Sequence, residues 1–180
     1  KHVVVPMAGG SLIIKIGKAI KEMIDLGLIE KSNMALYGAQ ASGSSPITTA
    51  VKKESDVIAP VIPNTIAHSI AIGNPADGYY SVKAINNSGG CAEDVSDDEL
   101  VEGIKLLAST EGIFTETAGG VTVAVTKKLI EQGKLPRDES IVICITGNGL
   151  KTLEAVMDNV EKPCVIDANI ESFNAFMEKR

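Results

Sequence analysis

The sequence has no tryptophan, and aromatic residues make up only 3% of its 180 residues. A core without large rings must be built from Ile, Val, Leu and Ala, which is typical of helices packed on a parallel sheet. The chain also has no apolar run long enough to cross a bilayer, because Lys15, Lys18 and Lys21 interrupt the longest candidate. These absences favour an α/β protein without a membrane span.

Cysteine and histidine are also scarce. The three cysteines, Cys91, Cys144 and Cys164, are widely spaced, and neither His2 nor His68 lies near one of them in the sequence. This pattern predicts no disulfide framework and no metal site, and therefore a reducing, cytoplasmic compartment.

Positive charge is in the minority. The sequence has 17 Lys and Arg against 23 Asp and Glu, a formal net charge of −6, and its basic residues occur only as short pairs such as Lys52-Lys53. Nucleic acids and anionic membranes both need a basic surface, so we expect neither as a partner. With 44% hydrophobic and 22% charged residues, the chain has an ordinary globular composition and is long enough for one domain or most of one.

The first residues lack both an initiator Met and a polar lead-in. Lys1 is followed almost at once by the strand-like run Val3-Val4-Val5, with no signal-peptide pattern. A β-branched run at this point indicates a chain that starts within a fold. We therefore expect residues 1–180 to be the C-terminal part of a larger domain.

Short apolar runs alternate with helical patterns along the chain. Strands are expected at residues 3–5, 34–39, 91–95, 141–145 and 164–166, and helices at residues 12–26, 76–87, 97–111 and 119–132, with a terminal helix that carries Phe173 and Phe176. Ser96 and Glu99 form a capping box before the third helix, and residues 55–77 are expected to be irregular. This order predicts a three-layer αβα fold around a mainly parallel, twisted sheet.

Two glycine-rich turns follow predicted strands. The first, Ala8-Gly9-Gly10-Ser11, opens a helix, where unpaired backbone amides and the helix dipole favour a phosphate. The second begins with Thr146 and Gly147, and it is not a P-loop because Leu150 separates Gly149 from Lys151. Ligands bind beyond the carboxyl ends of parallel strands, so we expect both turns to face one crevice. The alternatives are that glycine only serves the geometry of the first turn and that Thr146 only caps the second.

Other candidate residues carry weaker signals. His68 fits a surface histidine better than a catalytic base, and Ser42-Gly43-Ser44 lacks the frame of a nucleophile elbow. Glu116 stands just before a helix, where an acid favours the helix dipole, and it is a candidate site residue.

Five motifs carry a resemblance to a known family. In chain order they are VPMAGGSL from Val5, YGAQA from Tyr37, IGNPA from Ile72, EGIFTE from Glu111 and ITGNGLK from Ile145. Together they resemble the C-terminal half of threonine synthase, and the resemblance runs from about Val3 to Lys151.

This resemblance implies part of the large domain of a fold-type II pyridoxal 5′-phosphate enzyme. The cofactor-binding residues it implies are Ala8, Gly9, Gly10, Ser11, Leu12, Glu116, Thr146 and Gly147. Residues 8–11 would hold the cofactor phosphate, and the Thr146 hydroxyl would bond to the pyridine nitrogen. A neutral hydroxyl leaves that nitrogen largely unprotonated, which suits β,γ-elimination and replacement chemistry.

The implied reaction converts O-phosphohomoserine and water to threonine and phosphate. The Schiff-base lysine of the family lies in a Ser-x-Lys context, and no lysine of this chain matches that motif. We therefore expect the lysine upstream, no catalytic residue in this chain, and an inactive fragment when the chain is alone. The implied partners are the small-molecule substrate, the missing N-terminal half and a second copy in a homodimer.

Two other functions stay open. The closest is a threonine or serine dehydratase, or another pyridoxal-phosphate lyase of the same fold. A different class is a non-catalytic binding module that keeps the fold, which the missing lysine also permits.

Overall fold

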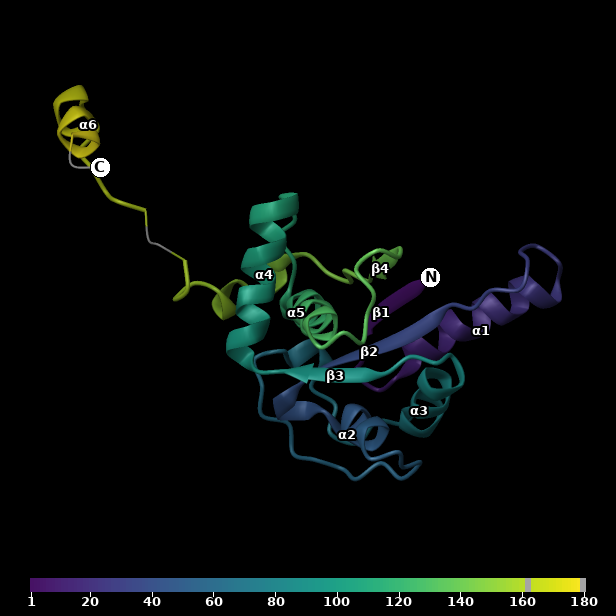
Figure 1. The fold of residues 1–180 in the computed structure, drawn as a ribbon. Helices are drawn as coiled ribbons and strands as arrows, with labels where there is room; N and C mark the ends of the chain where they lie inside the picture. Colours follow the sequence, from purple (N-terminus) through teal and green to yellow (C-terminus); the bar gives the residue numbers. More distant parts are fainter. Residues whose placement is uncertain (161–162, 179–180) are drawn as a thin grey trace.

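A computed structural model describes residues 1–160 and 163–178. Within these residues, the centre of the fold is a four-stranded parallel sheet with the strand order β3-β2-β1-β4 (Figure 1). The strands are β1 (His2–Pro6), β2 (Ala35–Ala41), β3 (Ala92–Val95) and β4 (Ile141–Ile143). Helices cover both faces of this sheet, which confirms the predicted three-layer αβα class.

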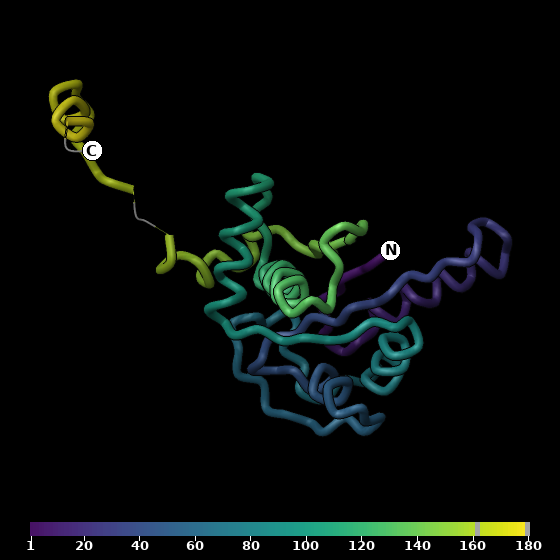
Figure 2. The backbone as a smooth tube through the Cα atoms, viewed as in Figure 1, coloured from purple at the N-terminus to yellow at the C-terminus, as the bar shows by residue number. Residues whose placement is uncertain are grey.

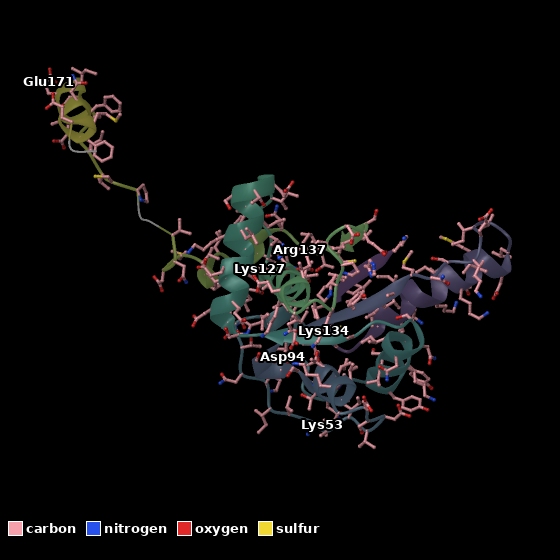
Figure 3. All side chains as sticks on the ribbon, viewed as in Figure 1. Lys53, Asp94, Lys127, Lys134, Arg137 and Glu171 are labelled. Carbon is pink, nitrogen blue, oxygen red and sulfur yellow. The ribbon has the colours of Figure 1, made fainter. Side chains whose placement is uncertain are left out.

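The helices divide between the two faces. One face carries α1 (Ser11–Asp25), α2 (Pro46–Lys52) and α3 (Gly78–Asn87), and the other carries α4 (Asp97–Glu111) and α5 (Thr117–Glu131) (Figure 1). Four short 3-10 helices are η1 (Ser42–Ser44), η2 (His68–Ile70), η3 (Gly149–Lys151) and η4 (Leu153–Ala155). The last helix, α6 (Ile170–Met177), lies apart from these layers, as the tube in Figure 2 and the labelled Glu171 in Figure 3 show.

Side chains that alternate along the strands build two cores. Val3 and Val5 of β1 pack with Ile13 of α1 and Val82 of α3, whereas Val4 packs into the core under α4 and α5. Successive side chains of a strand point to opposite faces, so a strand covered on both sides must be apolar throughout. This requirement explains the uninterrupted Val3-Val4-Val5 run.

Local sequence signals set the helix ends. At the start of α4, the Ser96 hydroxyl accepts a hydrogen bond from the Glu99 amide at 3.2 Å, and the Glu99 carboxylate accepts one from the Ser96 amide at 2.7 Å. This confirms the predicted capping box. Gly27, with φ +68°, follows α1, because a left-handed residue there ends a helix at the lowest steric cost.

Several predicted boundaries are wrong. The strand predicted at residues 141–145 is only three residues long and half-buried, with Val142 56% exposed, because among the described residues β4 lies at the sheet edge and pairs with β1 alone. No strand forms at residues 164–166, where Val165 is 93% exposed and no other strand is beside it. Helix α5 starts at Thr117, two residues earlier than expected, and α3 starts at Gly78, two residues later.

The strand order contains a reversal. From β1 the sheet grows to one side through β2 and β3, and the chain then returns to place β4 on the other side of β1. The connections on the two sides of β1 therefore diverge at the carboxyl ends of β1 and β4. Such a switch point leaves a crevice for ligands in open α/β sheets.

In the described residues, no helix combines the length and the apolar character needed to cross a membrane. Cys91, Cys144 and Cys164 are free thiols.

Candidate functional site

A pocket of about 220 Å³ lies at this switch point. Its walls come from the end of β1, the turn into α1, the 3-10 helix η2 and the turn after β4, and its lining residues are Pro6, Ala8, Gly9, Gly10, Ser11, Leu12, Ile70 and Thr146. The two glycine-rich turns thus border one cavity, as predicted from a parallel sheet.

The first turn offers unpaired backbone amides. Helix α1 begins at Ser11, and its N-cap, Gly10, has φ +97° and makes no side-chain capping bond. Within the described residues, no protein acceptor receives a hydrogen bond from the amides of residues 9–12. We call residues 8–12 the glycine loop. Free amides at a helix N-terminus, together with the helix dipole, provide an anion site without a charged side chain.

The carbonyl oxygens of the same segment are held by the protein. The Met7 oxygen accepts from Gln40 Nε2 at 3.3 Å, the Gly9 oxygen from the Asp77 amide at 3.0 Å, and the Gly10 oxygen from Ser81 Oγ at 3.2 Å. Carbonyl oxygens would repel an anion, so their engagement elsewhere favours the approach of an anion to the amides.

The second turn is braced by the segment before α5. The Gly147 carbonyl accepts from the Glu116 amide and from Thr115 Oγ1, both at 3.1 Å, and the Gly149 amide donates to the Phe114 carbonyl at 3.0 Å. A Cβ at Gly147 would lie 2.0 Å from Glu116 Oε1, so the Glu116 side chain would have to move. These contacts fix the backbone next to Thr146.

Glu116 lies beside this turn and not in the pocket lining. Its residue is 4% exposed, and Oε2 pairs with Lys151 Nζ at 3.1 Å. It occupies the N-cap position of α5, but its side chain makes no capping hydrogen bond. Of the eight predicted site residues, Ala8, Gly9, Gly10, Ser11, Leu12 and Thr146 line the pocket, while Gly147 and Glu116 lie close to each other outside the lining.

The other sequence candidates lie elsewhere. His68 is exposed at the start of η2, and the Ser42 hydroxyl donates to Asp94 Oδ2 at 2.6 Å. A larger open groove of about 710 Å³ runs between α4 and α5, and charges of both signs surround it. No residue of the two turns lines that groove, so the smaller pocket at the strand ends is the candidate site.

Sequence reasoning missed two kinds of residue. Pro6 and Ile70 line the pocket, and no motif pointed to Ile70, which arrives from an irregular segment far along the chain. Asp77 and Ser81 hold the glycine loop from outside, and Gln40 holds Met7 just before it. Gln40 left one signal, because it is a polar residue in an otherwise small and apolar strand, and it is fully buried.

The chain is similar in sequence to known threonine synthases. The chain is 40% identical over 179 residues to threonine synthase of Methanocaldococcus jannaschii, a match that covers 99% of the chain and 44% of the relative. It is also 40% identical over 172 residues to threonine synthase of Methanosarcina acetivorans, covering 95% of the chain and 42% of the relative. The chain therefore spans less than half the length of these relatives.

Solved structures agree on the fold. The processed form of threonine deaminase isoform 2 from Solanum lycopersicum superposes with a TM-score of 0.67 at 19% identity, over 89% of this chain and 44% of that one. At this identity the likeness concerns the fold alone. A family model described as pyridoxal-phosphate dependent enzyme matches residues 1–147, which include the glycine loop, Glu116, Thr146 and Gly147. The chain belongs to the family of pyridoxal-phosphate-dependent enzymes.

Proposed function

We propose that the full-length protein carrying this chain is a threonine synthase, which converts O-phosphohomoserine and water to threonine and phosphate. The observation that carries the proposal is the 40% identity to threonine synthases over nearly the whole chain. Because the chain spans less than half of those relatives, the activity is proposed for the full-length protein and not for this chain alone.

The pocket fits the phosphate end of pyridoxal 5′-phosphate. The free amides of residues 9–12 would donate to the phosphate oxygens, and the N-terminus of α1 favours their negative charge. The apolar side chains of Pro6, Leu12 and Ile70 would keep water from the organic part of the cofactor. When bound, this cofactor supplies an electron sink for carbanion chemistry.

Thr146 is proposed to face the pyridine nitrogen, since it lines the same pocket as the glycine loop and comes from a different turn. A hydroxyl is neutral, so it would leave the ring nitrogen largely unprotonated, which moderates the electron sink and suits elimination and replacement at the substrate side chain. Glu116 and Gly147 would keep the turn in place, with the Glu116 charge balanced by Lys151.

The open side of the pocket supports a divided site. Leu12 is 43% exposed and Thr146 is also exposed, although both line the cavity. We propose that the remainder of the full-length protein covers this side and supplies the Schiff-base lysine, so that residues 1–180 are the C-terminal part of the cofactor domain. The chain alone would then be inactive.

The experiment is an assay of phosphate release from O-phosphohomoserine by the full-length protein, with this chain run in parallel. Threonine is supplied separately, and ammonia release reports its deamination. Phosphate release by the full-length protein, with none from the chain alone, is the expected result. A covalent cofactor adduct on a lysine of the isolated chain would contradict the divided site.

A threonine or serine dehydratase of the same fold is the second candidate, because threonine deaminase shares the fold and the fold alone does not separate the two reactions. Ammonia from threonine without phosphate release from O-phosphohomoserine would identify that activity. Absence of both reactions and of cofactor binding would favour a non-catalytic binding module.

A further inference from the structure

We infer that Ser81 of α3 is a positioning residue that holds the glycine loop in the conformation that binds phosphate. The inference rests on the proposed cofactor site and adds to it a residue outside the pocket. Ser81 is fully buried, and its hydroxyl lies 3.2 Å from the Gly10 carbonyl oxygen and 3.0 Å from the Asp77 carbonyl oxygen. It therefore links α3 to the residue at which the loop becomes helix α1.

The fit between Ser81 and Gly10 is tight. A Cβ added to Gly10 would lie 2.0 Å from Ser81 Oγ and 3.1 Å from the Asp77 carbonyl oxygen. Gly10 also has φ +97°, a conformation that side chains rarely adopt. The short contacts show that α3 is packed directly on the backbone of the loop, and the positive φ shows that this position favours glycine.

Two further hydrogen bonds act on the same segment. The Asp77 amide donates to the Gly9 carbonyl at 3.0 Å, and Gln40 Nε2 donates to the Met7 carbonyl at 3.3 Å. Gln40 Oε1 in turn accepts from the Thr48 amide at 2.9 Å, which ties this link to α2. Three carbonyls of one short segment are thus bonded on the protein side.

This arrangement has a consequence for phosphate binding. When a peptide plane flips, its amide N–H and its carbonyl exchange directions. Holding the carbonyls of Gly9 and Gly10 fixes the planes of the peptide bonds that carry the Gly10 and Ser11 amides. Amides that are already aimed at the ligand spare it the entropy of ordering the loop, which is the benefit of preorganisation.

The test compares two ligands on the full-length protein after its cofactor has been removed. The dissociation constants of pyridoxal 5′-phosphate and of pyridoxal, which lacks the phosphate, are measured by the change in absorbance. Loss of one net hydrogen bond corresponds to about a three- to tenfold change in affinity. We expect Ser81→Ala to weaken the binding of pyridoxal 5′-phosphate by about that factor and to leave the affinity for pyridoxal unchanged.

Ser88→Ala is the matched control. Ser88 lies at the end of the same helix, and its hydroxyl also bonds to backbone, donating to Ile85 at 2.8 Å and accepting from the Leu36 amide at 2.9 Å. None of these groups belongs to the glycine loop. In Ser88→Ala, the ratio of the dissociation constants of pyridoxal 5′-phosphate and pyridoxal should therefore match that of the wild type. Ser81→Cys, which keeps a weakly donating group, serves if Ser81→Ala does not accumulate as folded protein.

The outcomes separate the two proposals. An unchanged ratio in Ser81→Ala, or an equal loss of affinity for both ligands, would overturn the positioning role and leave the cofactor site intact. A wild-type protein with no preference for the phosphorylated ligand would overturn both the inference and the proposed cofactor site.

Discussion

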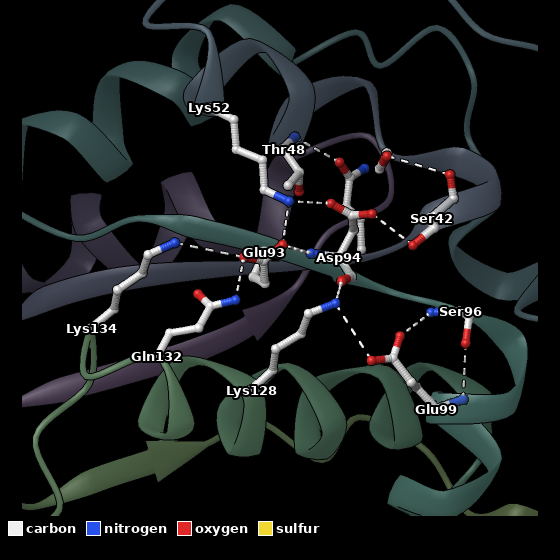
Figure 4. A network of polar contacts seen from close by, with 12 residues as sticks. Ser42, Thr48, Lys52, Glu93, Asp94, Ser96, Glu99, Lys128, Gln132 and Lys134 are labelled. Carbon is white, nitrogen blue, oxygen red and sulfur yellow. Dashed lines mark hydrogen bonds and ion pairs between the residues drawn. The ribbon is translucent and has the colours of Figure 1, made fainter.

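The carboxylate of Glu93 on β3 and the ammonium of Lys52 on α2 form an ion pair at the edge of the sheet (Figure 4). The Glu93 side chain is only 5% exposed, and its second oxygen accepts from Gln132 Nε2 at 3.1 Å and lies 3.7 Å from Lys134 Nζ. Lys52 belongs to the helical layer on one face, whereas Gln132 and Lys134 follow α5 on the other. Glu93 therefore joins both helical layers to an edge strand, and its charge also opposes pairing of that edge with another chain.

The Glu93 carboxyl should make the free energy of unfolding depend on pH in the acid range. Burial raises the pKa of its carboxyl, but hydrogen bonds from Lys52, the Asp94 amide and Gln132 outweigh burial and lower the pKa to about 2. A depressed pKa in the folded state stabilises the protein above the ordinary value of 4.5, and this contribution is lost as the pH falls from about 4.5 to about 2. We expect Glu93→Gln to lower the free energy of unfolding by about 2 kcal/mol at pH 7 and to reduce its dependence on pH in that window.

The measurement is denaturant unfolding of the full-length protein between pH 2 and pH 7. Glu102→Gln is the control, because Glu102 forms an exposed pair with Lys105 that contributes little. Equal loss of stability in both variants would contradict the special role of Glu93.

Thr146 should matter to the chemistry and not to the fold. Thr146→Val keeps the shape of an exposed side chain and removes its hydroxyl, so we expect turnover of the full-length protein to fall by about tenfold with unchanged unfolding. Steady-state kinetics and the absorbance spectrum of the bound cofactor measure the two effects. Thr110→Val, at the far end of α4, is the control, and equal turnover in both variants would remove Thr146 from the site.

Gly147 should be intolerant of a side chain because of one neighbour. Gly147→Ala would push its Cβ onto the Glu116 carboxylate, so we expect cofactor affinity to fall by about tenfold. Glu116→Ala opens that space, and the double variant should therefore lose less than the sum of the two single variants. Strict additivity in this double-mutant cycle would show that the two residues do not interact.

The three cysteines should differ in reactivity. Burial raises the pKa of the Cys91 and Cys144 thiols, whereas Cys164 is exposed in the segment before α6. The thiolate is the reactive form, so alkylation near pH 8 followed by peptide mass spectrometry should find Cys164 modified first. Cys91→Ala should leave turnover nearly unchanged, and rapid labelling of Cys91 would contradict its burial.

Comparison with the sequence-based expectations shows where local signals suffice. The capping box at Ser96 and Glu99 and the helix over residues 97–111 were predictable, because each depends on residues within a few positions of one another. The placement of both glycine-rich turns beside one pocket also followed, since parallel strands end at the same edge.

Local sequence signals did not predict which strands pair or which distant side chains meet. The apolar runs at residues 141–145 and 164–166 both predict strands, but only residues 141–143 form one, because a local apolar run does not reveal whether a neighbouring strand is present to pair with. The network around Glu93 was missed because its partners lie about 40 residues away in either direction.

The sequence by itself determined the alternation of helices and strands, the two glycine-rich turns and the resemblance that names the cofactor, since these depend on local conformation and residue order. Only the tertiary structure decided the strand order β3-β2-β1-β4, the edge position of β4 and the hydrogen bonds from Gln40, Asp77 and Ser81 that hold the glycine loop and Met7 just before it. The physical reason is that tertiary packing brings together groups more than 30 residues apart, and no local propensity encodes such a contact.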